Sequence, residues 1–185
     1  YINMKTITKE YKVFTLEELS KEAQKKAHDK WIAGNEYYFL SDNMTEYVKD
    51  ELLKKHNLTA EDITLRYSLS YSQGDGAMVE GEFGFEYEGL AYIAVVKHSG
   101  HYYHERSTSI EIFKLDIDND RGDIPDSVSY TDLDKYFEDT LYVPMCKELR
   151  DFGYGCIEGE DSFDSFKDSC EANEYTFLED GTMEN

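Results

Sequence analysis

The stretch that most constrains the fold covers residues 63–115, where polar and apolar residues alternate in separate runs. A first run alternates over residues 63–71, and a second alternates over residues 79–87. This period of two is typical of a strand with one buried face. Residues 90–96 are almost all apolar, as in a central strand, and residues 107–115 return to alternation. The sequence therefore predicts a four-stranded antiparallel meander.

Glycines stand where this meander must turn. Gly74 and Gly76 flank Asp75, and Glu88 is followed by Gly89. Glycine adopts the positive φ of tight turns at no steric cost. Ser99-Gly100 is interpreted as a two-residue hairpin turn between the third and fourth strands.

Helical spacing of apolar residues predicts four helices, near residues 16–34, 44–56, 131–149 and 163–170. Pro144 should kink or divide the third helix, because proline lacks the amide hydrogen that a helix interior uses.

Local signals suggest where helices begin and end. Thr15 and Glu18 form a capping-box pattern, and Asp161 or Ser162 should cap the last helix. Gly153 and Gly155 are expected to mark a break.

Two further strands are expected near the ends of the chain, over residues 5–14 and 174–178. The resulting fold class is α+β: one antiparallel sheet, made of the meander plus N- and C-terminal strands, with helices packed on it. A single domain should cover residues 4–185, and residues 1–3 are interpreted as an expression remnant ahead of Met4.

No apolar run approaches the length of a membrane span, and no signal-peptide pattern opens the chain. A cytoplasmic protein that does not enter a membrane is the expectation. Cys146, Cys156 and Cys170 are odd in number and have no CxxC spacing, which favours reduced thiols.

The charge is the outlying feature of the composition. The formal net charge is −21, from 40 acidic and 19 basic residues. Acids and bases balance up to Asn57, so the whole excess lies beyond it. Such a chain repels phosphates, which argues against direct binding to nucleic acid and favours a basic protein partner.

Two groups of carboxylates are the candidates for contact with that partner. One group lies in an acidic loop and the other near the C-terminus. The loop group is Asp116, Asp118, Asp120, Asp123 and Asp126, and the C-terminal group is Glu158, Glu160, Asp161, Asp164 and Asp168.

A metal site is a second hypothesis. His98, His101 and His104 lie within seven residues. Across a two-residue turn His98 and His101 would face each other with Cβ atoms about 4.5–5.5 Å apart, while His104 would join only through a bulge or a longer loop. With Asp75 they would supply the nitrogen and oxygen donors of a zinc site; the alternative is a polar hairpin without metal.

Other chemistry is not indicated. The loop over residues 116–127 lacks the glycine and glutamate of a calcium-binding EF-hand, and Gly74-Asp75-Gly76 matches no phosphate-binding loop. No local signature pairs a cysteine with a histidine for nucleophilic catalysis, so the sequence indicates a protein that is not an enzyme.

Tyrosine is abundant, with 16 residues. Tyrosine offers a large contact area at low entropic cost and is favoured at protein interfaces. Tyrosines among carboxylates suit a surface that docks on arginine-rich protein through charge, hydrogen bonds and cation–π contact. The alternative is that most of them cover a small core.

Four segments together resemble a family of small proteins from phages and mobile elements of Gram-positive bacteria. They are FTLEELSKEAQKKAHDKW, SLSYSQGDGAMVEGEF, HSGHYYHERS and CEANEYTFLEDGTME. The shared motif residues, to which the resemblance assigns no individual role, are Ser72, Gln73, Gly74, Asp75, Gly76, His98, Gly100, His101, Tyr103 and His104.

Proteins of this type resemble anti-CRISPR inhibitors of the type II RNA-guided nuclease, and some are labelled antitoxin-like. The resemblance implies a stoichiometric inhibitor whose carboxylates stand in for phosphates in the nuclease's positively charged channels. The alternatives are a small metal-binding protein and an antitoxin-like phage protein with another basic partner.

Overall fold

The computed structural model describes residues 8–116 and 121–184. Their fold is α+β, as predicted. The chain divides into two compact units, Tyr38–Cys156 and the described parts of Tyr1–Tyr37 with Ile157–Asn185. The expectation of one domain stays a prediction, because a division of contacts does not show that either unit folds alone.

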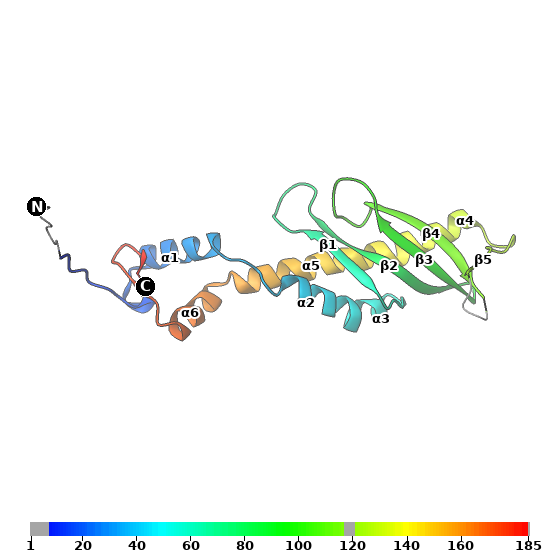
Figure 1. The fold of residues 1–185 in the computed structure, drawn as a ribbon. Coiled ribbons are helices and arrows are strands. Elements are labelled where there is room, and N and C mark those ends of the chain that lie inside the picture. The colour runs from blue at the N-terminus through cyan, green and yellow to red at the C-terminus, as the bar shows by residue number, and fades with distance from the viewer. Residues whose placement is uncertain (1–7, 117–120, 185) are drawn as a thin grey trace, which may run out of the picture. The chain divides into compact units, whose positions relative to one another are not determined.

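The unit Tyr38–Cys156 contains a five-stranded antiparallel sheet (Figure 1). Its strands lie side by side in chain order: β1 (Ile63–Ser68), β2 (Gly76–Tyr87), β3 (Leu90–His98), β4 (Thr108–Leu115) and β5 (Arg121–Gly122). The first four form the predicted meander. The short fifth strand lies within a segment expected to be a loop and pairs with Lys114 and Leu115.

Glu88 and Gly89 join β2 to β3 in the tight turn that the sequence predicts. Tyr87 pairs with Leu90, and the two turn residues have φ of 51° and 77°. Two consecutive positive φ values match the right-handed twist of the strands that they connect.

The connection between β3 and β4 differs from the prediction. His98 pairs with Thr108, so residues 99–107 form a long loop and Ser99-Gly100 is not a two-residue turn. The loop closes through backbone hydrogen bonds from Ser99 to Ser107 (2.8 Å) and from Ser107 to His104 (2.9 Å). A longer loop places His98 and His101 away from the cross-strand positions expected for a short hairpin.

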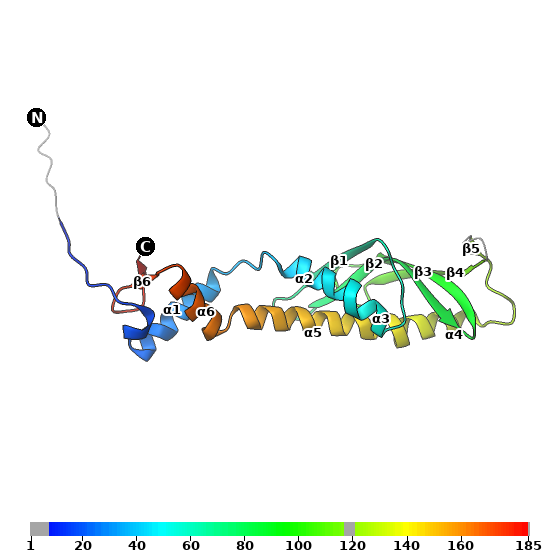
Figure 2. The same ribbon diagram turned by 90° about the horizontal axis from the view of Figure 1, so that it is seen from below.

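One face of this sheet packs on a long helical segment (Figure 2). The segment runs through α4 (Tyr130–Lys135), the π-helical η3 (Tyr136–Tyr142) and α5 (Val143–Glu160). Phe83 and Phe85 on β2 meet Tyr142 and Phe137, with ring centroids 5.7 and 5.0 Å apart. All four side chains are buried, which makes this the main core of the unit.

The long segment bears on two predictions. Pro144 is the second residue of α5, directly after the π-helical η3, so the segment changes helix type beside the proline. A kink at Pro144 stays a prediction. Gly153 and Gly155 do not break the helix, which continues to Glu160. A Cβ on Gly153 would lie 2.5 Å from Leu69 and 2.9 Å from Met44, so this glycine permits close packing.

A second helical stretch of this unit runs through α2 (Leu40–Tyr47), the π-helical η2 (Val48–Leu52) and α3 (Leu53–Lys55). It starts earlier than residue 44. Met44, Val48 and Leu52 are fully buried, and their spacing of four places them on one helical face.

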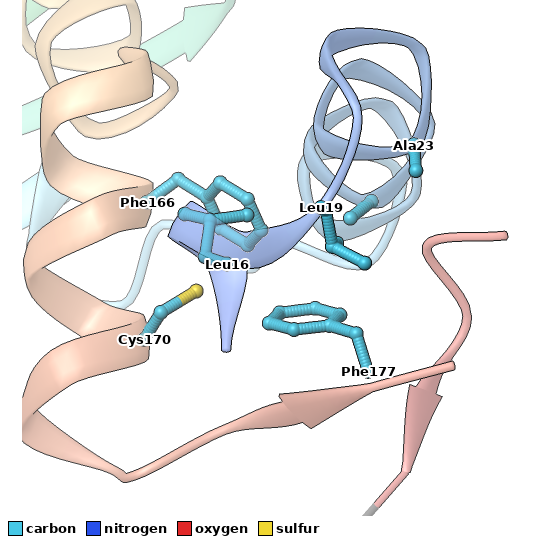
Figure 3. Packing of buried hydrophobic residues seen from close by; sticks show 7 residues of the cluster. Leu16, Leu19, Ala23, Phe166, Cys170 and Phe177 are labelled. Carbon is cyan, nitrogen blue, oxygen red and sulfur yellow. The ribbon is translucent and has the colours of Figure 1, made fainter. Parts of the chain in front are cut away.

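The other unit contains η1 (Leu16–Glu18), α1 (Lys21–Ala33), α6 (Phe163–Ala172), β6 (Thr176–Phe177) and β7 (Met183–Glu184). Its core places Leu16, Leu19 and Phe177 around Phe166 and Cys170 (Figure 3). Small Ala23 and Ala27 let α1 lie close to this core.

The predicted capping signals of this unit are confirmed. The Thr15 amide donates to Glu18 Oε2 at 2.8 Å, and the Ser162 hydroxyl accepts from the Ser165 amide at 3.1 Å. The first helix is nevertheless interrupted after η1, and Ser20 caps α1.

The prediction of an N-terminal strand over residues 5–14 is wrong for residues 8–13, which belong to no strand. Residues 5–7 lie outside the described part of the chain. Phe14 alone forms a β-bridge, with Phe177. The expected C-terminal strand is present as β6, but it pairs with β7 in a separate small sheet.

Candidate functional site

The two motifs that stand out in the sequence pack against each other. We call the turn over residues 70–76 and the loop over residues 99–107 the two-loop site. A Cβ on Gly74 would lie 2.7 Å from the Tyr102 ring, and one on Gly76 would lie 2.4 Å from Cβ of His104. The two glycines therefore allow a contact that no larger residue fits.

Asp75 holds the turn together from its centre. Its carboxylate accepts backbone hydrogen bonds from Ser70 (2.7 Å) and Ser72 (3.0 Å). The hydroxyls of Ser68, Ser70 and Ser72 donate to it at 3.0–3.1 Å, and the Tyr154 hydroxyl of α5 donates at 2.5 Å. Six donors around one carboxylate fix the turn to β1 and to the helix.

These contacts shift two pKa values. Burial by itself raises the pKa of Asp75, but the hydrogen bonds from Tyr154, Ser72 and Ser70 outweigh it and hold that pKa well below its ordinary value. Burial and the hydrogen bond to Asp75 raise the pKa of Tyr154 to about 12. Asp75 is therefore a charged structural centre at neutral pH.

Three tyrosines of this site face solvent. Tyr71 is 65% exposed, Tyr102 is 50% exposed and Tyr103 is 37% exposed. Tyr71 has φ of 55°, a left-handed conformation that costs a bulky residue about 1 kcal/mol. Its ring lies 4.6 Å from that of Tyr154, so the strained residue also has a fixed orientation.

The loop over residues 99–107 is anchored at its C-terminal side. Arg106 donates to Glu138 at 3.1 Å and to Asp139 at 2.8 Å, both on η3. His104 Nδ1 accepts from the Arg106 amide at 3.1 Å. The exposed aromatics thus stand on a loop that is tied to the helix and to the neighbouring turn.

The histidines proposed as metal ligands make contacts within the loop over residues 99–107 and do not form a common metal site. His98 Nε2 lies 3.2 Å from the Tyr102 carbonyl, and the His101 ring packs edge-on against Tyr102. Asp75 is occupied by its six donors. Over residues 8–116 and 121–184, no three His, Cys, Asp or Glu side chains form a group that could hold a metal ion. Zinc binding stays a prediction, and elemental analysis tests it.

The acidic loop is described in part. Asp118 and Asp120 lie outside the described residues. Asp116 pairs with Lys114 at 2.8 Å, and Asp123 and Asp126 are exposed.

The C-terminal group of carboxylates lies at the end of α5 and along α6. Asp161 accepts hydrogen bonds from Asn35 (3.0 Å) and Tyr37 (2.8 Å), so its role is structural. Glu158, Asp164 and Asp168 are exposed, and Glu160 is half-buried.

The buried thiols are inert. Burial raises the pKa of Cys146 to about 12 and that of Cys170 to about 11, so both stay protonated at neutral pH.

Sequence reasoning missed Tyr154 and the serines Ser68, Ser70 and Ser72 as partners of Asp75. Tyr154 is 79 residues from Asp75 along the chain, and no local sequence pattern predicts a contact over that separation. The run of serines before Asp75 was the only available signal.

No protein-family model, curated protein or solved structure matches this chain. In the part of the chain that the structure describes, no helix is both long and apolar enough to cross a membrane.

Proposed function

We propose that this protein is a stoichiometric binding inhibitor of a basic protein, with the two-loop site as its aromatic contact surface. The observation that carries the proposal is the set of exposed tyrosines, Tyr71, Tyr102 and Tyr103, held on loops that Asp75 and Arg106 anchor. Anchored aromatics lose little entropy on binding, which is why such residues become interface hot spots.

The chemistry of this surface suits arginine. A tyrosine face attracts a guanidinium group, and its hydroxyl both donates and accepts hydrogen bonds. The net charge of −21 attracts a cationic partner over a distance of about a Debye length, roughly 8–10 Å at physiological salt. Charge would speed the encounter, and the tyrosines would supply short-range affinity.

As the partner we propose a type II RNA-guided nuclease in the bacterial cytoplasm, on the basis of the resemblance to anti-CRISPR proteins. Such a nuclease holds its nucleic acids in positively charged channels and reads a short duplex motif with arginines. A protein that occupies one of these surfaces blocks DNA recognition or loading without any catalysis of its own.

The test compares two exposed tyrosines of the same unit. Tyr102→Ala removes a ring of the two-loop site, and Tyr130→Ala removes a ring of similar exposure (48%) from α4. Affinity for the guide-loaded nuclease is measured by calorimetry, together with DNA cleavage at increasing inhibitor ratios. Tyr102→Ala should weaken binding about tenfold or more, and Tyr130→Ala should leave it unchanged.

Equal effects of the two variants would refute the two-loop site as the contact surface. Loss of cleavage at far less than one inhibitor per nuclease would refute the stoichiometric mechanism. Capture of another basic protein from host lysate, with no binding to the nuclease, would favour the antitoxin-like alternative.

A further inference from the structure

The sheet of the unit Tyr38–Cys156 has a second face, opposite the one that packs on the long helical segment (Figure 2). Because neighbouring residues of a strand point to opposite faces, this side carries the residues that alternate with Phe83. We call it the outer face, and its central residues are Glu82, Ile93, Val95, Glu111 and Phe113. Ile93, Val95 and Phe113 are half-buried, so an apolar strip on β3 and β4 remains accessible.

The sequence of β3 suits a strand that is covered on both faces. Residues 90–96 do not alternate with polar residues, whereas a strand with one solvated face does. Tyr92, Ala94 and Val96 are buried on the inner face, while Ile93 and Val95 on the outer face are only half-buried. Within the described residues of this unit, β3 therefore has a covering layer on one face and lacks it on the other.

A groove of about 610 Å³ hollows the outer face. Ile93 and Leu115 supply apolar surface, and Gly81 and Gly84 leave room on β2. The described residues that line the groove come from β2, β3, β4 and residues 59–62, and none of them comes from a helix.

The outer face already holds one cation of its own chain. Arg121 of β5 pairs with Glu82 of β2, although β3 and β4 lie between these strands. Across a flat sheet β2 and β5 would be about 14 Å apart, so the sheet curls toward the outer face. The guanidinium also lies over the ring of Phe113, 5.1 Å from its centroid. Carboxylate and aromatic ring together thus bind a positive charge here.

Carboxylates outnumber cations on the outer face and its rim. Arg66 and Arg121 are each paired with a glutamate of β2, which leaves Lys97 as the cation without an ion pair among the described residues. The exposed carboxylates that make no ion pair with a described lysine or arginine are Glu61, Asp62, Glu86 and Glu111. A second copy of the chain would bring like charges together, so the charge favours a cationic occupant.

We propose that the outer face binds a cationic amphipathic helix. A helix is about 10–12 Å in diameter, which matches the width of about 10 Å from β2 to β4. Its apolar stripe would cover Ile93, Val95 and Phe113 as a second layer on the sheet, and its basic flanks would meet the carboxylates of the rim. This proposal deepens the proposed function, on which it rests for the source of the helix, a basic helix of the partner.

The test titrates the whole protein with model peptides and follows backbone amide shifts by NMR. The probe is an acetylated and amidated peptide of about 15 residues of leucine, arginine and glutamine, whose leucines recur every three or four residues. The first control peptide has the same composition with leucines at alternate positions, and the second replaces each arginine with glutamate. The probe should shift the amides of Ile93, Val95 and Phe113 at concentrations where neither control does.

Two outcomes of this titration would overturn the proposal. Equal shifts with the probe and the first control would show attraction by charge without a helical stripe. Shifts spread over the acidic surface, with none at Ile93, Val95 and Phe113, would show that the peptide does not bind the outer face.

Variants identify the groups responsible. Val95→Thr keeps the shape of the side chain and should weaken probe binding about fivefold, because it places a hydroxyl in the apolar strip. Val128→Thr, at a half-buried valine before α4, is its control and should leave binding unchanged. Glu111→Gln should weaken binding about twofold, whereas Glu51→Gln on η2 should not.

Arg121 supplies a test of opposite sign. Arg121→Gln removes the cation that occupies Glu82 and Phe113, so it should strengthen probe binding about threefold. Lys135→Gln, at an exposed position of α4, changes the net charge equally and should have a smaller effect. Equal strengthening by both variants would contradict a site on the outer face.

The nuclease separates this proposal from the proposed function. If the probe binds the outer face but the protein fails to bind the nuclease, only the proposed function falls. If the nuclease binds Val95→Thr and Glu111→Gln as tightly as wild type, the partner's helix does not bind the outer face. A dimer in sedimentation that Val95→Thr dissociates would overturn the cationic occupant in favour of a second copy.

Discussion

At the scale of single residues, Asp75 decides the form of the two-loop site. Its carboxylate gathers two backbone amides, three serine hydroxyls and the Tyr154 hydroxyl. Gly74 and Gly76 on either side give Tyr102 and His104 the room to approach. One charged side chain therefore orders the turn on which the exposed aromatics stand.

Asp75→Asn should destabilise the protein by about 2–3 kcal/mol, because an amide presents N–H groups to donors and loses charge-assisted bonds. Urea unfolding at neutral pH measures the change. Asp126→Asn, at an exposed position, is the control and should lie within about 0.5 kcal/mol of wild type. Equal effects would show that the hydrogen-bond network contributes little.

Stability should depend on pH through the same group. The folded-state pKa of Asp75 lies below its unfolded value of about 3.9. Its contribution is therefore fully present above that value and is lost as the pH falls through the lower folded-state pKa. The difference in unfolding free energy between wild type and Asp75→Asn should shrink below about pH 4. A difference that stays constant from pH 6 to pH 2 would contradict this assignment.

At the scale of elements, α5 shows that glycine in a helix can serve packing. Gly153 and Gly155 stand two residues apart in the same helix. A Cβ at Gly153 would meet Leu69 and the fully buried Met44, whereas a Cβ at Gly155 would meet nothing within 4 Å.

The two positions should respond differently to alanine. Gly155→Ala should raise the free energy of unfolding by about 0.5–1 kcal/mol through helix propensity alone. Gly153→Ala should be at least about 1 kcal/mol less stable than Gly155→Ala, because packed side chains must move. Thermal and urea unfolding of both variants measure the difference in stability. Equal stabilisation by the two substitutions would show that the contact between α2 and α5 can accommodate an extra methyl group.

At the scale of the whole molecule, the excess of negative charge is the property on which the proposed function depends. A net charge of −21 on 185 residues opposes compaction, so we connect it with binding. Some carboxylates are nevertheless structural: Asp75 and Asp161 are held by hydrogen bonds within their own units. Variants that test the role of charge must therefore retain Asp75 and Asp161.

Affinity for the nuclease should fall as salt rises from 50 to 500 mM, because exposed charges are screened. Replacing the aspartates of the acidic loop with asparagine should weaken binding and flatten its salt dependence. The substituted residues are Asp116, Asp118, Asp120, Asp123 and Asp126.

A second variant removes four charges from the C-terminal group, Glu158, Glu160, Asp164 and Asp168, and keeps Asp161. Full activity of both variants, with affinity unchanged by salt, would refute an electrostatic mechanism.

Local patterns were sufficient for much of the fold. Alternation identified three of the four main strands, and the apolar run over residues 90–96 identified the other. Thr15 and Ser162 marked helix starts, because caps depend on neighbouring residues. The sequence by itself determined the fold class, the order of the four meander strands and the charge.

Tertiary structure alone decided how the motifs meet. The anchoring of the 99–107 loop on Glu138 and Asp139, the Tyr154 hydrogen bond to Asp75 and the closeness of Gly153 to Met44 join segments far apart in the chain. The conformational preferences of neighbouring residues do not predict such contacts. Several backbone conformations have similar local energy, and packing between distant segments decides which of them the folded protein adopts. The surface on which the proposed function depends is therefore a product of folding, assembled from motifs that the sequence shows only one at a time.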